Sequence, residues 1–258
     1  MRSVAIERTN FQINTKLKYM NTISHNHKPA TDAYTMLADA VIRPILFSTP
    51  MVQAILDGRK TQTRRTKGLE EINDFLKGDP HNYSFLEQKY FNGRLEQRIN
   101  VANQFFVIHP KVNIGDIFWV RETFMDAPNF EDWGGEKYYY KASKSEQFLN
   151  EWKGNWKPSI FMPKEACRIF LKVTNMRVER LKDISEEDAI AEGVKDICIA
   201  PLIFRWKCYE KTREVVFKNP IDSFYSLWQS INGKENWNQN PWVWVYEFEQ
   251  VERPYGFC

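Results

Sequence analysis

The segment 168–181 gives the clearest β-strand signal in the chain, because its apolar and polar side chains alternate. Ile169, Leu171 and Val173 fall on one face of an extended backbone, in which successive side chains point to opposite sides. The pattern predicts one long strand or a bent pair of strands. A chain with such an element folds around a β-sheet that has an apolar face.

Four shorter segments also have the apolar runs of strands. They cover residues 43–47, 101–108, 117–120 and 243–251. Helices are predicted between them. The first helix leads up to Gly58, with Met51, Ile55 and Leu56 at helical spacing before it, and a glycine in that place ends a helix.

Two further helices are predicted in the second half of the chain. Ser185 and Asp188 are spaced as a helix cap, so a helix begins there and is expected to end at Gly193. Over residues 221–231, apolar side chains recur at positions i, i+3, i+4 and i+7, which indicates an amphipathic helix. This mixture of strands and helices indicates an α+β fold.

The composition supports a folded chain. Of its 258 residues, 43% are hydrophobic and 15% aromatic, enough for a sizeable core in one large domain or two small ones. Disorder of the whole chain is excluded. The net charge of +3, from 36 basic and 33 acidic residues, is too small to indicate nucleic-acid binding by itself.

Neither a metal nor a membrane is indicated. The 4 cysteines and 4 histidines show no zinc-ligand spacing, so we expect reduced thiols, no metal and no cofactor. No apolar stretch approaches the ~20 residues of a membrane span, and the N-terminus lacks the apolar core of a secretory signal. A cytoplasmic protein without a membrane partner is expected.

The chain is expected to divide into an extension, a main domain and a tail. Residues 1–42 are polar and weakly periodic, which predicts a disordered or weakly ordered extension. A docked helix near residues 33–40 is the alternative. The main domain is expected over residues 43–252, and residues 253–258 form the tail.

Residues 58–65, GRKTQTRR, place a glycine turn next to a lysine, two threonines and three arginines. The cluster begins where the first predicted helix ends. Its cations suit an anion, and its hydroxyl groups suit a nucleophile. It is the strongest candidate for a site with chemistry.

The order Gly58, Lys60, Thr63 and Arg65 resembles the G-x-K-x-x-(E/T)-x-R signature of the ASCH domain, a small β-barrel related to the PUA fold. Three more segments resemble the longer ASCH proteins common in phages and prophages, namely residues 115–123, 184–194 and 240–248. The resemblance implies a PUA-like β-barrel with flanking helices and inserted loops. Relative to small ASCH amidohydrolases, the insertions lie near residues 67–110 and 126–156, and they leave a larger or different substrate open.

Some ASCH members hydrolyse N4-acetylcytidine, and the spacing from Lys60 to Thr63 resembles theirs. The resemblance implies that Lys60, Thr63 and Glu192 are the catalytic residues of an amidohydrolase that needs no metal. Amide cleavage needs a nucleophile, a proton carrier and a cation for the developing oxyanion. Lys60 has two open roles, as a desolvated amine that activates Thr63 or as an ammonium that stabilises negative charge.

Each of these residues also has a plain reading without the resemblance. Lys60 would be a solvated lysine beside a helix end, Thr63 a turn hydroxyl, and Glu192 a carboxylate on a helix surface.

Four charged residues are candidates for substrate binding. Arg64 and Arg65 can grip a nucleotide phosphate or close a salt bridge inside the barrel. Arg121 and Glu122 lie at the end of a predicted strand, as a polar wall of the pocket or as a cross-strand ion pair.

Ser48 and Thr49 lie at a strand-to-helix junction, which suits either an anion site or simple helix capping. A nucleobase also needs a flat surface for stacking. The aromatic candidates are Phe47, Trp119, Phe124 and Trp156.

Different classes of function follow from this cluster. The first is an enzyme that hydrolyses an acylated nucleoside or base. The second is a binding module, in which the same cleft holds RNA or a modified nucleotide without turnover. A ribonuclease is a weaker third alternative, because the sequence shows no plausible pair of catalytic histidines.

Overall fold

A computed structural model describes residues 40–75, 83–91, 94–101, 104–127, 136–151, 154–210 and 216–257. The chain separates into two units, Met1–Ala40 and Val41–Cys258, and the described helices and strands belong to the second. The predicted extension and the alternative helix near residues 33–40 lie outside the described residues, apart from the last residues of the extension.

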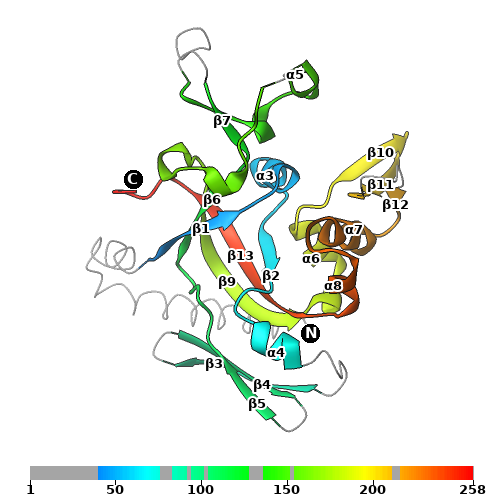
Figure 1. The fold of residues 1–258 in the computed structure, drawn as a ribbon. Coiled ribbons are helices and arrows are strands. Elements are labelled where there is room, and N and C mark those ends of the chain that lie inside the picture. Colours follow the sequence, from blue (N-terminus) through cyan, green and yellow to red (C-terminus); the bar gives the residue numbers. More distant parts are fainter. Residues whose placement is uncertain are drawn as a thin grey trace, which may run out of the picture. The chain divides into compact units, whose positions relative to one another are not determined.

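The second unit is built on a curved five-stranded sheet (Figure 1). Its order is β1 (Ile42–Leu46), β6 (Ile117–Arg121), β9 (Phe170–Arg180), β13 (Trp242–Val251) and β2 (Gln62–Arg65). β1 and β6 are parallel, and the other neighbours are antiparallel. The long alternating segment forms β9 as predicted, and β13 pairs with it from end to end.

The structure does not show the predicted closed β-barrel. Among the described strands, β1 and β2 are the two edges of the five-stranded sheet and share no ladder. The helix α3 (Thr49–Leu56) connects these edges along the chain. They meet through a side chain instead, since Arg65 Nη2 donates to Leu46 O at 2.9 Å. The fold is therefore mixed α+β around an open, curved sheet.

Both faces of β13 are covered. Trp244 and Tyr246 belong to the main core cluster, whereas Val243 and Val245 pack in a second cluster with Phe224 and its neighbours on α7 (Pro220–Asn232). Side chains alternate across a strand, so burial on both faces requires a continuous apolar run. The amphipathic helix predicted over residues 221–231 is α7, and it covers one face of this strand.

The predicted helix ends are confirmed. In α6 (Glu186–Ala191), the Ser185 hydroxyl accepts a hydrogen bond from Asp188 N at 3.1 Å. Glu192 is the C-cap residue of α6, and Gly193 follows it with φ of +90°. The helix α3 ends just before Gly58, which has φ of +72°. Glycine adopts these left-handed conformations without the steric cost of a Cβ atom.

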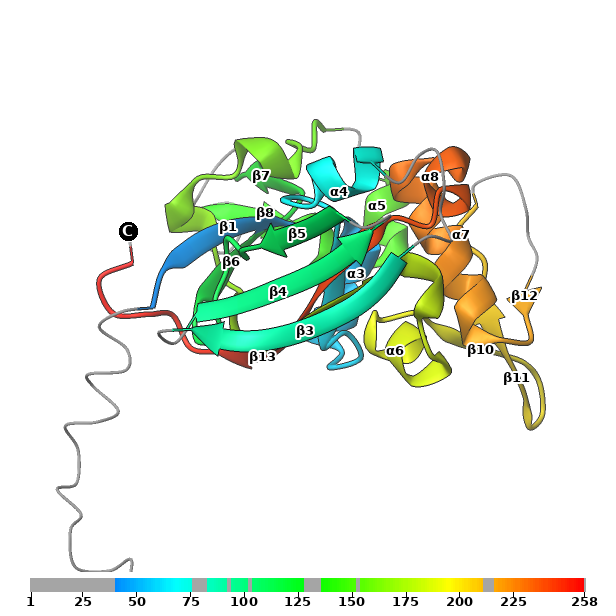
Figure 2. The same ribbon diagram turned by 90° about the horizontal axis from the view of Figure 1, so that it is seen from below.

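The first predicted insertion contains more regular structure than its turn signals indicated. It holds α4 (Glu70–Phe75) and an antiparallel sheet of β3 (Tyr83–Phe91), β4 (Arg94–Val101) and β5 (Gln104–Ile108), seen side by side in Figure 2. The single strand predicted over residues 101–108 is wrong, because Val101 ends β4 and pairs with Gln104 at the start of β5. These strands are stabilised by pairing with each other, and the hydrophobic periodicity of a single segment does not reveal such pairing.

The second insertion contains the hairpin of β7 (Phe124–Asp126) and β8 (Tyr138–Tyr140), followed by α5 (Glu146–Glu151). The remaining elements are β10 (Asp196–Ala200), β11 (Ile203–Lys207), β12 (Val216–Phe217), α8 (Lys234–Asn238) and short 3-10 helices at Lys141–Ser143, Ser159–Phe161, Lys164–Ala166 and Leu181–Asp183. Within the described ranges, no helix is both long and apolar enough to cross a membrane.

Candidate functional site

A short backbone bridge holds the Lys60 loop against the end of α6. Lys60 and Glu192 pair as an antiparallel bridge, and the next residue, Thr61, donates its N–H to Ala191 O at 2.9 Å. Gly193 permits this close approach, because a Cβ atom there would lie 2.8 Å from Lys60 Cβ, a separation that packed carbon atoms do not adopt. The glycine after α6 thus brings Glu192 against Lys60.

Lys60 is a buried and fully hydrogen-bonded lysine. Its ammonium donates to Glu192 Oε2 at 2.8 Å, to Glu192 O at 2.9 Å and to Gln62 O at 2.8 Å. The exposed fraction of its side chain is 0%, against 2% for Glu192. We call Lys60 and Glu192 the buried pair. Burial lowers the pKa of the Lys60 ammonium below its usual value, and the Glu192 carboxylate opposes this effect only in part.

Arg64 supplies a second cation to the same carboxylate. Its Nη1 donates to Glu192 Oε1 at 3.1 Å, and its other donors reach Glu179 Oε1 at 3.0 Å and Asp188 Oδ2 at 2.7 Å. Burial alone lowers the pKa of the Arg64 guanidinium, but the carboxylates of Glu192, Glu179 and Asp188 outweigh burial and raise it overall. Arg64 therefore stays charged beside Glu192.

The charges continue outward through Arg177. Its guanidinium donates to Glu179 Oε2 at 2.9 Å, to Asp188 Oδ2 at 2.7 Å and to Glu247 Oε1 at 2.5 Å. The whole set, which we call the charge network, consists of Lys60, Arg64, Arg177, Glu179, Asp188, Glu192 and Glu247. It connects β2, β9, β13 and α6.

Thr63 lies on the other face of β2 from Arg64. Gln62 and Arg64 face α6, where Gln62 Nε2 donates to Asp188 O at 2.9 Å. Because side chains alternate along a strand, Thr63 points to the opposite face, where its partner Tyr246 is part of the main core. Thr63 is buried, and among the described hydrogen bonds none joins it to the buried pair. Of the three predicted catalytic residues, Lys60 and Glu192 are in contact, whereas Thr63 lies on the opposite face of β2.

Arg65 and Lys60 share an aromatic neighbour. The Arg65 guanidinium carbon lies 5.1 Å from the centre of the Phe47 ring, and Lys60 Nζ lies 5.5 Å from it. Burial lowers the pKa of Arg65. Its Nε is buried without a hydrogen-bond partner in the described part of the chain. Arg65 Nε is therefore a buried donor without a described partner on the core side of β2.

Arg121 and Glu122 do not pair with each other. Glu122 is buried and accepts two hydrogen bonds from Arg168, at 2.8 Å to Oε1 and 2.9 Å to Oε2. Arg121 instead donates to Ile160 O and lies over the Trp119 ring at 5.3 Å. For Glu122, the alternative of an ion pair with a neighbouring strand agrees with the structure, since Arg168 lies just before β9, the neighbour of β6. Neither residue touches the charge network through a described contact.

Ser48 and Thr49 lie at the start of α3, and neither contacts the buried pair through a described hydrogen bond. Ser48 is the capping residue, but its hydroxyl makes no capping hydrogen bond in the described structure. Its backbone oxygen accepts from Val52 N at 3.0 Å. Ser48 therefore occupies the cap position, as the capping alternative expected, but the helix begins through this backbone contact and through Pro50 rather than through the hydroxyl.

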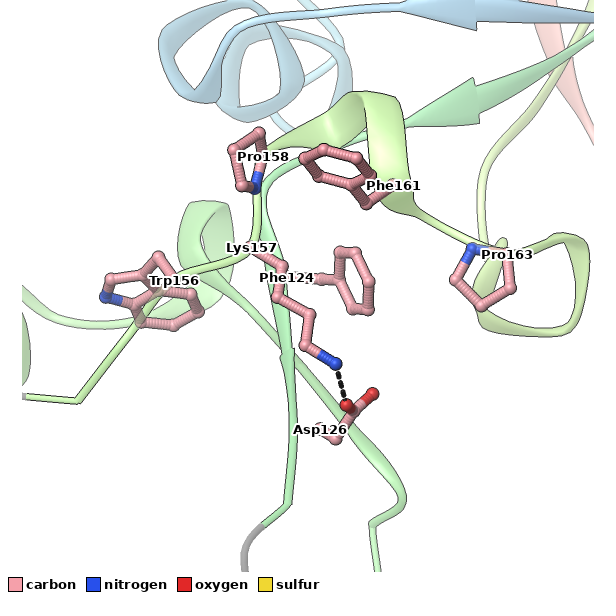
Figure 3. Close-up of a pocket in the computed structure, with 7 residues that line it drawn as sticks. All are labelled: Phe124, Asp126, Trp156, Lys157, Pro158, Phe161 and Pro163. Carbon is pink, nitrogen blue, oxygen red and sulfur yellow. Dashed lines mark hydrogen bonds and ion pairs between the residues drawn. The ribbon is translucent and has the colours of Figure 1, made fainter.

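Among the aromatic candidates, Phe124 and Trp156 line one pocket of about 540 Å³. Figure 3 shows it with Phe161 at its side and with the ion pair of Lys157 and Asp126. Trp119 is buried against Phe257 instead. Phe47 is buried as well, next to Lys60 and Arg65. This pocket lies where the two ends of the second insertion meet, at Asp126 and Trp156.

Sequence reasoning did not identify four members of the charge network: Arg177, Glu179, Asp188 and Glu247. Asp188 was recognised only as part of a helix cap. A signal was present in β9, where Arg177 and Glu179 occupy alternate positions on its polar face. Charged side chains on one strand face can pair with each other and with groups on a neighbouring element.

Within the described residues, no three His, Cys, Asp or Glu side chains form a cluster suited to a metal ion. Comparisons with protein-family models, with curated proteins and with solved structures found no match to this chain.

Proposed function

We propose that this chain is a PUA-like ASCH amidohydrolase that removes an acyl group from a nucleoside or base, with N4-acetylcytidine as the first substrate to test. The observation that supports the proposal best is the buried pair, with 2.8 Å between Lys60 Nζ and Glu192 Oε2. Two of the three proposed catalytic residues are therefore in contact in a site shielded from water, where electrostatic interactions are stronger than in solvent.

The hydrogen bonds favour one of the two roles for Lys60. Its three donors meet three oxygen atoms, which suits an ammonium and leaves a neutral amine with too few protons. We therefore assign Lys60 to the stabilisation of the oxyanion through its positive charge alone, because its three protons are already donated to protein oxygens. Each oxygen of Glu192 accepts one described hydrogen bond and has a second lone pair, so this carboxylate can still accept a proton.

In the proposed reaction, Thr63 Oγ attacks the acyl carbon and its proton passes to Glu192. The C–N bond then breaks, and Glu192 returns the proton to the leaving amine. Water hydrolyses the resulting Thr63 ester and releases the carboxylate. For this step the Thr63 hydroxyl must move from the core face of β2 to the face of the buried pair.

The test is release of acetate and cytidine from N4-acetylcytidine by the purified full chain, followed by chromatography. Turnover by the wild type that is lost in Lys60→Met and in Thr63→Val supports the proposal. A wild type that releases no acetate from the nucleoside or from acetylated RNA contradicts it.

The second candidate function is a nucleotide- or RNA-binding module that performs no chemistry. The saturation of Lys60 by three acceptors favours it, because a closed ion pair can serve structure alone. In that case acetylated RNA binds to the wild type without turnover, and the affinity falls as salt rises.

A further inference from the structure

A second polar pocket, which we call the basic pocket, lies between α3, the residues after α6 and the end of β11. Its volume is about 290 Å³. The polar side chains around it are Gln53, Asp57, Arg59, Lys195, Lys207 and Tyr209. It shares no side chain with the charge network.

The backbone under the basic pocket is well anchored. Lys207 N donates to Lys195 O at 2.8 Å, and Lys195 N donates to the Tyr209 hydroxyl at 3.1 Å. Ser223 Oγ donates to Lys207 O at 2.5 Å, which ties the end of β11 to α7. These hydrogen bonds hold the backbones of Lys195 and Lys207 next to each other.

The basic pocket has an excess of positive charge. Arg59, Lys195 and Lys207 contribute three positive charges and Asp57 one negative charge, which leaves a net +2. Asp57 is already paired with Arg59, at 2.8 Å from Nη2. Among the described residues, neither lysine ammonium has a carboxylate partner.

Donors remain available for a ligand. Arg59 uses Nη1 for Gly193 O at 2.8 Å and Nη2 for Asp57, which leaves three of the five protons of a guanidinium. Burial raises the pKa of Tyr209, so its hydroxyl keeps its proton at neutral pH and can donate it. Lys207 Nζ lies 5.6 Å from the Tyr209 ring, at the same side of the pocket.

We propose that the basic pocket binds a phosphomonoester or inorganic phosphate. Such a group carries about −1.5 to −2 charge near neutral pH and three acceptor oxygens, which match the net +2 charge and the three separate cations. The predominance of polar side chains does not suit an apolar ligand.

This site is separate from the one assigned to hydrolysis. Arg59 and Lys60 are consecutive residues at the bridge to Glu192, and consecutive side chains of an extended backbone point to opposite sides. Arg59 accordingly reaches Gly193 O while Lys60 turns inward to Glu192. The proposal therefore does not depend on the proposed function, and its test measures binding alone.

The experiment is isothermal titration of the full chain at low ionic strength with inorganic phosphate, with cytidine 5′-monophosphate and with cytidine. The double variant Lys195→Gln/Lys207→Gln removes two charges from the pocket. The matched control, Lys182→Gln/Lys234→Gln, removes two exposed charges elsewhere. Circular dichroism establishes that all variants are folded.

We expect saturable binding of a phosphate compound by the wild type, at least about tenfold weaker binding by the pocket variant, and a change under about twofold in the control. Binding of inorganic phosphate and the nucleotide alike identifies a site for phosphate alone, whereas binding of the nucleotide only shows that the nucleoside is contacted too. The proposal is overturned if neither compound saturates the wild type, if cytidine binds equally well, or if both double variants lose affinity to the same degree.

Discussion

Lys60 Nζ and Glu192 Oε2 lie 2.8 Å apart, although the two residues are 132 positions apart in the chain. Both side chains are shielded from solvent, and the carboxylate is shared with Arg64. In a buried ion pair, the attraction between the two charges offsets the cost of removing them from water. Removing one partner leaves the other charge buried and unpaired, which destabilises the fold more than replacing both partners. The pair therefore holds α6 against the Lys60 loop whatever its chemical role.

Replacement of Lys60 by Met should destabilise the domain by about 3–5 kcal/mol, because Glu192 would keep only Arg64 as a cationic partner. Urea unfolding followed by tryptophan fluorescence measures this change. The control is Lys137→Gln, at an exposed pair with Glu165, where the expected change is under about 1 kcal/mol. Equal midpoints for Lys60→Met and wild type would show that the pair contributes nothing to stability.

Gly193→Ala should be much more damaging than an alanine at another glycine of the same backbone conformation. Gly193 and Gly115 have φ of +90° and +93°, so both alanines bear a similar conformational cost of about 1–2 kcal/mol. Only at position 193 would the new Cβ also lie 2.7 Å from Ala54 Cβ, whereas nothing lies within 4 Å at position 115. We expect an additional loss of about 1–3 kcal/mol for Gly193→Ala in thermal unfolding. Similar melting temperatures for the two variants would be inconsistent with this packing.

Cys167 should make the stability of the domain depend on alkaline pH. Burial raises the pKa of its thiol from 9.0 to about 11, and its Sγ donates to Ile169 O at 3.3 Å. Above pH 9 the unfolded chain loses this proton while the folded chain keeps it, so stability falls as the pH rises from about 9 to about 11. Below pH 9 this contribution is fully present.

The measurement is the difference in unfolding free energy between wild type and Cys167→Ala, taken at several pH values. We expect the advantage of the wild type to shrink by up to about 2 kcal/mol between pH 8 and pH 11. Other alkaline groups, such as Tyr140, are present in both proteins and cancel. A difference that does not change with pH would contradict burial of the thiol.

Much of the central fold could be predicted because its elements carry their own local signals. β9 alternates, α7 has an apolar stripe, and α6 has a serine cap and a terminal glycine, each visible within a few residues. The strands β3 and β4 carry no such pattern, because they are specified by pairing with each other. Local sequence also could not predict whether the sheet closes into a barrel, because closure depends on the positions of the edge strands β1 and β2 in space.

The candidate site shows the same division. The resemblance to ASCH proteins selected Lys60 and Glu192, and the structure brings them together through a glycine whose importance depends on contacts with Ala54 and Lys60. It did not indicate that Arg64 and Arg177 would link the pair to three more carboxylates. Ion pairs between distant elements depend on register and crossing geometry, which no single segment encodes.

The measurement that tests the account most directly is acetate release from N4-acetylcytidine by wild type, Glu192→Gln and Asp116→Asn. Asp116 is the matched control, a buried carboxylate that accepts from Val41 N at 3.0 Å and from Asn113 N at 2.9 Å and that lies 3.5 Å from Arg43. The account predicts turnover by the wild type, retention of most activity by folded Asp116→Asn, and loss of at least about a hundredfold in folded Glu192→Gln, because only the latter removes the proton acceptor. Equal activity of Glu192→Gln and wild type, or no turnover by wild type, would contradict it.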